Sequence, residues 1–181
     1  MIIHFIGPGG AGKTTTANKL SLRLGVKYYD LDEYFMLMEG DISTFIRKYS
    51  YRGYAIRNIQ LYLQLKDLLN INNLSVVVCS SGFMTYPIDI YCNYKNIKQE
   101  IEFSPFTFLL LPSLELEGCV EEIVRRQVKR EYLNSSAKRE EEKIRNRFPI
   151  YFNLKCKKIL TNDDTSTIVY KIHRQLFQLL K

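Results

Sequence analysis

Gly7-Pro8-Gly9-Gly10-Ala11-Gly12-Lys13-Thr14 is the stretch of this 181-residue chain that decides its fold. These eight residues match the pattern G-x-x-x-x-G-K-[ST], in which backbone N–H groups surround phosphate oxygens. The apolar run Ile2–Ile6 precedes the stretch, and a segment with helical spacing, 15–24, follows it. The alternative is a chance glycine-rich turn after a strand. Such a turn would not need all the fixed positions of the pattern to be present between a strand and a helix. The stretch therefore predicts a phosphate loop that binds a nucleoside triphosphate.

The residue types of this loop indicate which ligands they bind. Lys13 is expected to reach the β- and γ-phosphates of ATP, and the Thr14 hydroxyl to ligate Mg²⁺. We expect Lys13 to face solvent in the nucleotide-free loop. The residues expected to contact ATP are Gly9, Gly10, Ala11, Gly12, Lys13, Thr14 and Thr15.

Composition indicates an ordinary soluble globular protein. Hydrophobic residues make up 46% and charged residues 25% of the chain, and its length suits one domain spanning 1–181. No apolar run approaches the length of a membrane span, and the short N-terminal run leads into the phosphate loop rather than a signal-peptide cleavage site. Four scattered cysteines without CxxC spacing predict neither a zinc site nor a redox pair. We expect reduced, buried or semi-buried thiols in a cytoplasmic protein.

The net charge of +7 comes from the last third of the chain. Residues 121–181 hold 15 Lys and Arg against 8 Asp and Glu, whereas the two signs balance in 1–120. A basic surface can bind nucleic acid, but the chain has no RNP, KH or zinc-finger pattern. Nucleic acid is therefore not the expected partner, because substrates that are polyanions would also account for the charge.

Strand and helix patterns alternate along the chain. Strand patterns occur at 2–6, 26–30, 74–79, 106–111 and 158–161, and helical patterns at 15–24, 33–39, 43–49, 54–69, 114–132, 137–147 and 165–180, with another within 88–101. This order predicts an α/β fold of three layers, α/β/α, around a central parallel sheet of about five strands. Ligands of such sheets lie beyond the carboxyl ends of the strands. The phosphate loop, Asp30 with Asp32, and 80–82 all fall there.

Asp30 and Asp32 follow the second strand pattern at i, i+2 spacing. Where the backbone turns, one carboxylate can approach Mg²⁺ while the other accepts a proton or hydrogen bond from a hydroxyl group. The alternative is that Asp32 is an ordinary N-cap of the next helix. The neighbouring phosphate loop favours the functional interpretation.

The motifs and their order resemble those of the shikimate kinases, a branch of the nucleoside-monophosphate-kinase-like phosphate-loop enzymes. That family has a phosphate loop, a D-x-D, an F-R-x-x-E on the next long helix, a G-G-G, an Arg-rich lid and a late R-x-P-x-Y. The corresponding segments here are Gly7–Thr14, 30–32, 56–60, 80–82, 125–133 and 147–151. The resemblance covers nearly the whole chain, and the first, second and last motifs are the most specific.

The resemblance implies a kinase fold with substrate-binding helices at about 33–70 and a helical lid at about 125–138. It implies that Asp30 helps to hold Mg²⁺ and that Asp32 contacts the ring hydroxyls and orients the acceptor. The remaining residues that it implies are Arg57, Ser81, Gly82 and Arg147 for acceptor binding, and Arg126 or Arg130 for the transition state. Arg57 and Arg147 would grip a carboxylate, which a planar guanidinium binds through two hydrogen bonds.

Several positions depart from the family pattern and leave the acceptor open. Ser80 and Ser81 replace two glycines, Gln60 replaces the acid that follows the helix arginine, and Glu131 replaces the lid proline. The proline of the late adenine loop is also missing from 161–164. We interpret the chain as an ATP-dependent kinase that phosphorylates a hydroxyl of a shikimate-like carboxylated acceptor. The alternatives are a nucleotide or other metabolite kinase, and a catalytically silent ATP-binding regulatory module.

Overall fold

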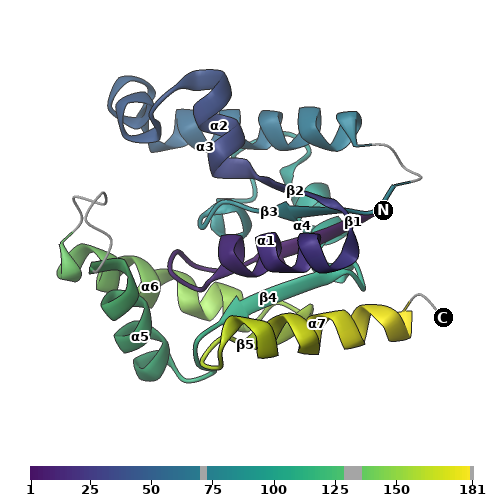
Figure 1. The fold of residues 1–181 in the computed structure, drawn as a ribbon. Coiled ribbons are helices and arrows are strands. Elements are labelled where there is room, and N and C mark those ends of the chain that lie inside the picture. Colours follow the sequence, from purple (N-terminus) through teal and green to yellow (C-terminus); the bar gives the residue numbers. More distant parts are fainter. Residues whose placement is uncertain (70–72, 129–135, 180–181) are drawn as a thin grey trace.

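Five parallel strands form the centre of the molecule in a computed structural model that describes residues 1–69, 73–128 and 136–179. The strands are β1 (Ile2–Ile6), β2 (Lys27–Asp30), β3 (Ser75–Val78), β4 (Thr107–Leu111) and β5 (Lys157–Leu160). Their order in the sheet is β2-β3-β1-β4-β5, with every pair parallel (Figure 1). β1 lies in the middle because β3 and β4 pair with its two edges, so the chain that follows β1 leaves at the switch point of the sheet.

Helices cover both faces of this sheet. On one face α1 (Lys13–Leu24) and α7 (Thr165–Leu179) bury Leu20 and Ile172 against Phe5 and Leu110. On the other face lie α3 (Ile42–Leu68), α4 (Tyr94–Phe103), α5 (Leu116–Val128) and α6 (Ala137–Phe152) (Figure 1). Strands covered on both faces read as nearly continuous apolar runs, which is what the sequence shows. The predicted three-layer fold with a parallel sheet of five strands is confirmed.

Three features of the helices differ from the sequence-based expectation. The two helices expected at 43–49 and 54–69 join as α3, with a kink at Ser50, whose φ of 68° and ψ of 167° are not helical. α6 continues past the expected end at 147 to Phe152 and contains Pro149, whose carbonyl accepts from the Asn153 amide. A short 3₁₀ helix, η1 (Phe83–Thr85), follows β3 and was not expected. The helix of nine residues after β2 is α2 (Leu31–Glu39).

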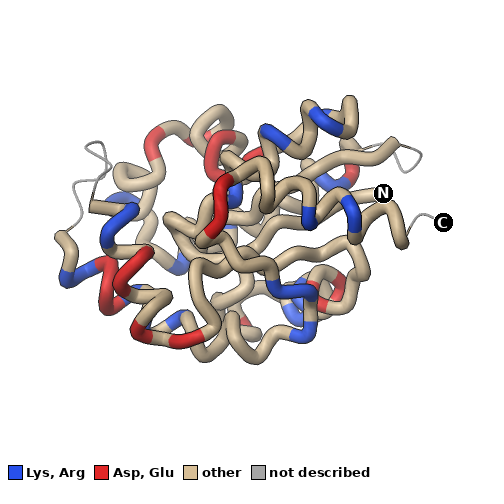
Figure 2. Tube along the Cα trace, turned by 60° about the horizontal axis from the view of Figure 1, so that its bottom comes forward, with Lys and Arg blue, Asp and Glu red and all other residues tan. Residues whose placement is uncertain are grey.

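The basic last third of the chain does not form a continuous basic face on α5 and α6. Figure 2 shows acidic and basic residues interleaved there, and several of them are paired. Arg145 of α6, for example, lies 2.6 Å from Glu117 of α5 and 2.8 Å from Glu141. The excess of positive charge is therefore partly offset on these two helices.

The cysteines and the helices bear on the expected environment of the protein. All four thiols are free, and Cys79, Cys119 and Cys156 are buried, but Cys92 is exposed, contrary to the expectation that all would be at least partly buried. Within the described ranges, each helix is too short or too polar to cross a bilayer.

The expected lid at 125–138 and its Arg130 lie largely outside the described residues, since α5 ends at Val128 and α6 begins at Ala137.

Candidate active site

The phosphate loop connects β1 to the N-terminus of α1 and has the backbone that its glycines permit. Gly12 is the N-cap of α1, with φ of 86°, which a residue with a side chain rarely adopts. A Cβ on Gly7 would lie 2.4 Å from the Leu110 carbonyl oxygen, so the backbone of the loop passes directly over the end of β4. Thr14 and Thr15 lie in the exposed first turn of α1. The loop therefore places the N-terminus of α1, where backbone N–H groups can bind an anion, at the carboxyl edge of the sheet.

Lys13 is buried, contrary to the expectation that it would face solvent. It is only 8% exposed, and its Nζ donates to the carbonyl oxygens of Gly7 at 2.8 Å and Pro8 at 2.9 Å. A buried ammonium requires acceptors, and these two carbonyls of its own loop supply them. The side chain is thus held over the phosphate loop rather than extended into water.

Thr14 and Asp30 are in direct contact at the ends of α1 and β2. The Thr14 hydroxyl donates to Asp30 Oδ2 at 2.6 Å, and Asp30 Oδ1 accepts from the Asp32 backbone N–H at 2.9 Å. Asp30, not Asp32, is therefore the N-cap of α2, and the capping alternative for Asp32 is wrong.

The side-chain oxygens of Thr14 and Asp30 are of the kind that suits Mg²⁺ better than a transition metal. Among the described residues, His, Cys, Asp and Glu form no group of three that could hold a metal. Mg²⁺ commonly uses one or two protein oxygens and completes its octahedron with phosphate and water. The pair formed by Thr14 and Asp30 beside the phosphate loop fits that ligand set.

Asp32 lies at the end of a buried polar network between α2, α3 and β3. Its Oδ1 accepts hydrogen bonds from the hydroxyls of Ser80 at 2.5 Å and Tyr54 at 3.2 Å, and the Asn58 amide donates to Ser80 at 3.0 Å. Its Oδ2 has no donor within the described part of the chain. Burial, followed by the charge of Asp30, raises the pKa of Asp32, although the Ser80 hydrogen bond opposes this shift. Asp32 thus keeps one oxygen available to a ligand.

Tyr54 and Asn58, which are not among the predicted site residues, hold Asp32 and Ser80 from the side of α3. Both residues are buried, and they lie one turn apart on the same face of the helix. Asn58 is completely buried. A polar residue at i+4 from a tyrosine on an otherwise apolar face was the signal that could have found them, because buried amides need partners.

Arg147 of α6 contacts the segment after β3. Its Nη1 donates to the Ser81 carbonyl at 3.3 Å, and its Nη2 to the Tyr51 hydroxyl at 2.9 Å. No carboxylate in the described ranges forms an ion pair with Arg147. A Cβ on Gly82 would lie 3.2 Å from Arg147 Nη2, so this glycine lets the guanidinium approach the backbone. The structure therefore brings Ser81, Gly82 and Arg147 together.

Arg57 is held differently from Arg147. Its Nη2 lies 2.6 Å from Glu39 Oε1 at the end of α2, and its Nε donates to the same oxygen at 2.7 Å. Gln60 accepts only a longer hydrogen bond, at 3.3 Å. Glu39 thus supplies the acid that the sequence lacks at Gln60. No contact joins Arg57 to the Arg147 cluster among the described residues.

Arg126 ties α5 to the phosphate loop and to the end of β5. Its Nε lies 2.6 Å from Glu122, and its Nη1 and Nη2 donate to the Gly10 carbonyl at 3.3 Å and the Thr161 carbonyl at 2.7 Å. Next to it, Gln127 packs on the loop so closely that a Cβ on Gly9 would lie 2.6 Å from its Nε2. Arg126, one of the two candidate lid arginines, therefore contacts the phosphate loop.

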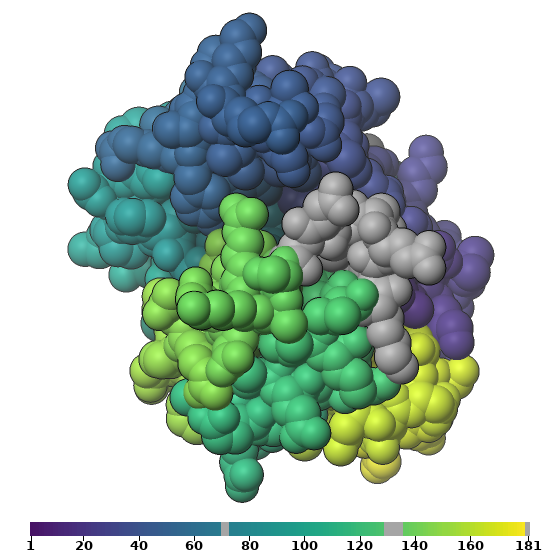
Figure 3. Space-filling model, turned by 90° about the vertical axis from the view of Figure 1, so that its left-hand side faces the viewer, coloured from purple at the N-terminus to yellow at the C-terminus, as the bar shows by residue number. Residues whose placement is uncertain are grey.

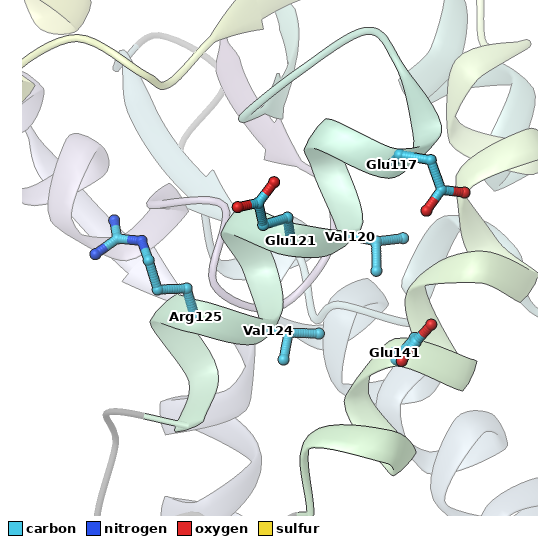
Figure 4. Close-up of a pocket in the computed structure, with 6 residues that line it drawn as sticks. All are labelled: Glu117, Val120, Glu121, Val124, Arg125 and Glu141. Atoms are coloured by element: carbon cyan, nitrogen blue, oxygen red, sulfur yellow. The ribbon is translucent and has the colours of Figure 1, made fainter.

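Two helical units flank this polar cluster. Figure 3 shows α2 and α3 in blue above α6 in green on one face of the molecule, and the hydrogen bond between Arg147 and Tyr51 connects them. A separate shallow cavity of about 390 Å³ lies between α5 and α6 (Figure 4). Its lining residues are Glu117, Val120, Glu121, Val124, Arg125 and Glu141, none of which was predicted to bind nucleotide or acceptor.

A parallel sheet with a phosphate loop at its switch point, and with carboxylates at and just after the end of β2, two strands away in the same sheet, defines a phosphate-loop kinase. The family model for shikimate kinase matches residues 9–177, so the chain belongs to the shikimate kinase family. It is therefore an ATP-dependent kinase that phosphorylates a hydroxyl group of a shikimate-like acceptor. The match does not favour the alternatives of another kinase or a silent module.

Solved structures agree with this fold. The shikimate kinase from Acinetobacter baumannii in complex with shikimate is 22% identical, with a TM-score of 0.72 over 98% of this chain and 93% of the other. Deoxyadenosine kinase from M. mycoides has 20% identity and a TM-score of 0.62 over 98% and 100%. A gluconokinase from Sinorhizobium meliloti is 14% identical, with a TM-score of 0.60 over 98% of this chain and 91% of the other. At these identities the likeness concerns the fold alone. A comparison with curated proteins finds no match.

Proposed function

We propose that the acceptor lies along the segment 80–82, with its reacting hydroxyl at Asp32 and its carboxylate at Arg147. The observation that carries this proposal is the pair of consecutive serines. Ser80 donates to Asp32 at 2.5 Å, and the Ser81 carbonyl accepts from Arg147 at 3.3 Å. One short segment thus connects a carboxylate that can take a proton to a guanidinium without an acidic partner in the described chain. A hydroxylated carboxylic acid has the complementary groups.

Asp32 is the proposed general base. The acceptor hydroxyl would give its proton to Oδ2 while its oxygen forms a bond to the γ-phosphorus, and ADP leaves with the electrons of the broken bond. Burial that raises the pKa of Asp32 makes it a better base than an exposed aspartate. Hydrogen bonds from Ser80 and Tyr54 hold the other oxygen and fix the direction of the carboxylate.

The phosphate loop and Lys13 are proposed to hold the ATP phosphates, with Thr14 and Asp30 as the protein ligands of Mg²⁺. When bound, the metal neutralises charge on the β- and γ-phosphate oxygens. Lys13 would exchange the carbonyls of Gly7 and Pro8 for phosphate oxygens over a short distance, because it is already positioned above the loop. Either Arg126, which touches the Gly10 carbonyl, or Arg130 of the lid is proposed to add positive charge beside the transferring group.

Arg57 is proposed as a second residue that interacts with the acceptor, with a smaller effect than Arg147. Glu39 already occupies its Nε and Nη2, so a bound carboxylate would compete with an existing ion pair. The whole chain is proposed to act as one domain in the cytoplasm, where its free thiols would remain reduced.

Turnover with ATP and a panel of hydroxylated acids, shikimate first, tests this function by following ADP release. For an acid that is turned over, Arg147→Ala should weaken acceptor binding by about 2–4 kcal/mol, as for loss of a charge-assisted bidentate pair. The KM for ATP should stay within about twofold. Arg145→Ala is the matched control, because Arg145 lies on the same helix and pairs with Glu117 and Glu141 instead. Turnover of nucleosides but of no acid would refute the proposed acceptor class.

A further inference from the structure

Tyr51 enters the site because α3 is kinked immediately before it. The φ of 68° and ψ of 167° at Ser50 lie in a region that is nearly restricted to glycine. The Ser50 hydroxyl accepts from the Gly53 amide at 3.3 Å and so caps the helical segment that begins after the kink. In a straight helix, Tyr51 would follow Ser50 with the ordinary helical rotation of about 100° per residue. The kink instead directs Tyr51 toward α6 and the segment after β3.

The Tyr51 hydroxyl is held by Arg147 and has a proton to donate. Its oxygen accepts from Arg147 Nη2 at 2.9 Å, so the phenolic O–H points elsewhere. That proton has no acceptor in the described chain. Burial raises the pKa of Tyr51, so the hydroxyl stays protonated at neutral pH, although the nearby Arg147 opposes the shift. The side chain is nevertheless 43% exposed, which leaves it accessible to a ligand.

Gly82 provides the space that this arrangement needs. A Cβ built on it would lie 2.5 Å from the Tyr51 hydroxyl oxygen, closer than any real contact of that kind. The φ of Gly82 is −100°, so its backbone does not require glycine. The position is restricted by what packs on it, namely Tyr51, Tyr86 and Arg147. The last residue of the 80–82 segment therefore serves to bring the phenol and the guanidinium side by side.

We propose that Tyr51 is an acceptor-binding residue whose hydroxyl donates a hydrogen bond to the acceptor carboxylate beside Arg147. The phenol and the guanidinium together offer one neutral and one charged donor to a planar anion. The pair selects acceptors that carry a carboxylate, while Asp32 and Ser80 receive the hydroxyl groups. This inference rests on the proposed function, because it places the carboxylate at Arg147. It adds a recognition residue that the sequence motifs do not contain.

Tyr51→Phe tests the inference, because it removes the hydroxyl and keeps the ring. With shikimate as the probe, calorimetry and ADP release should show affinity reduced by roughly tenfold to a hundredfold, as expected when a hydrogen bond to a charged group is lost. The KM for ATP should not change. The methyl ester of shikimate should bind the parent weakly and lose little more in the variant. Tyr49→Phe, on the same helix before the kink and 51% exposed, is the matched control and should resemble the parent.

A second variant probes the same contact from the other side. Gly82→Ala should weaken shikimate binding, since the new methyl group meets the Tyr51 hydroxyl. In the Tyr51→Phe background the added loss should be at least threefold smaller, because the closest atom has been removed. Additive losses would show that Gly82 does not act through Tyr51 and would overturn this part of the inference.

The outcomes separate this inference from the proposed function. If the parent phosphorylates shikimate or another hydroxy acid and Tyr51→Phe leaves its KM unchanged, the inference falls and the proposed function stands. Equal losses for the acid and its ester would also overturn the inference, because the hydroxyl would not be reading the carboxylate. If the parent turns over no carboxylated acceptor, the proposed function fails and the inference fails with it.

Discussion

Ser50→Gly should stabilise the protein, although it removes a side chain that caps a helix. The backbone at Ser50, with φ of 68° and ψ of 167°, costs a residue with a Cβ about 1–3 kcal/mol. Glycine adopts this conformation freely, but it gains roughly 0.4–1 kcal/mol of chain entropy in the unfolded state. The loss of the cap to Gly53 costs only a few tenths of a kcal/mol when glycine replaces serine, on the order of 0.3. The net expectation is a gain of about 1 kcal/mol.

Thermal unfolding followed by circular dichroism measures this gain, which corresponds to a rise in Tm of about 2–4 °C for a chain of this size. Ser43→Gly is the control, because Ser43 is exposed in the regular first part of α3 and its replacement should lower stability by about 0.5 kcal/mol. Because glycine preserves the kink, Ser50→Gly should leave the KM for the acceptor within about twofold of the parent value, on the order of the scatter expected for uncoupled changes. Equal destabilisation by both substitutions would refute the strain at Ser50 and with it the account of how Tyr51 is positioned.

Three further predictions concern groups whose burial or charge the structure defines. Lys13→Ala should lower kcat by at least about 10²-fold and, because it removes the donor to two buried carbonyls, also lower Tm; unchanged turnover would contradict the role of the loop. Asp32→Asn should lower kcat by about 10²- to 10⁴-fold. The raised pKa of Asp32 means that the ionised carboxylate destabilises the folded state relative to the unfolded state. Asp32→Asn should therefore also raise stability at neutral pH, and this gain should shrink as pH falls toward 3.8, where the carboxylate becomes protonated. His4 is buried, and its Nε2 lies 3.0 Å from the Tyr62 hydroxyl oxygen. Burial is the main cause that lowers the pKa of His4 to about 3. As pH falls below 6.5, His4 is protonated in the unfolded state but stays neutral in the folded state, so acidification destabilises the parent. Denaturant titrations should therefore show that lowering the pH from 6.5 to 4 reduces the stability of His4→Gln less than that of the parent.

Several residues of the site followed from local patterns in the sequence. The phosphate loop was recognisable because its glycines, Lys13 and Thr14 occupy fixed positions between a strand and a helix. Asp30 was found because it ends a strand of the same sheet, and the structure places it 2.6 Å from Thr14. Arg147 was found from a short motif and the order of motifs around it. Its hydrogen bond to the Ser81 carbonyl joins the middle of α6 to the segment after β3, a proximity that depends on how α6 packs against the sheet.

Other parts of the site depend on how helices pack and could not follow from local patterns. Glu39 pairs with Arg57 only because α2 folds back beside α3, and no spacing rule relates the two residues. Lys13 turns toward the carbonyls of its own loop, which depends on the path of the backbone around it. The motif suggested an exposed side chain, because it defines the ligand and not the conformation of the lysine.

The sequence by itself determined the layered α/β fold, the location of the phosphate loop and the class of reaction. Hydrophobic periodicity and glycine-rich turns are local properties, and a chain of alternating strands and helices can bury its apolar faces in few ways. Only the tertiary structure decided which side chains gather around Asp32 and Ser81. The position of Tyr51 depends on a kink at Ser50 that no residue preference predicts. The positions of Tyr54 and Asn58 depend on which face of α3 packs against the segment after β3. Such contacts are long-range in sequence, so their geometry is fixed by the packing of the whole core rather than by any one segment.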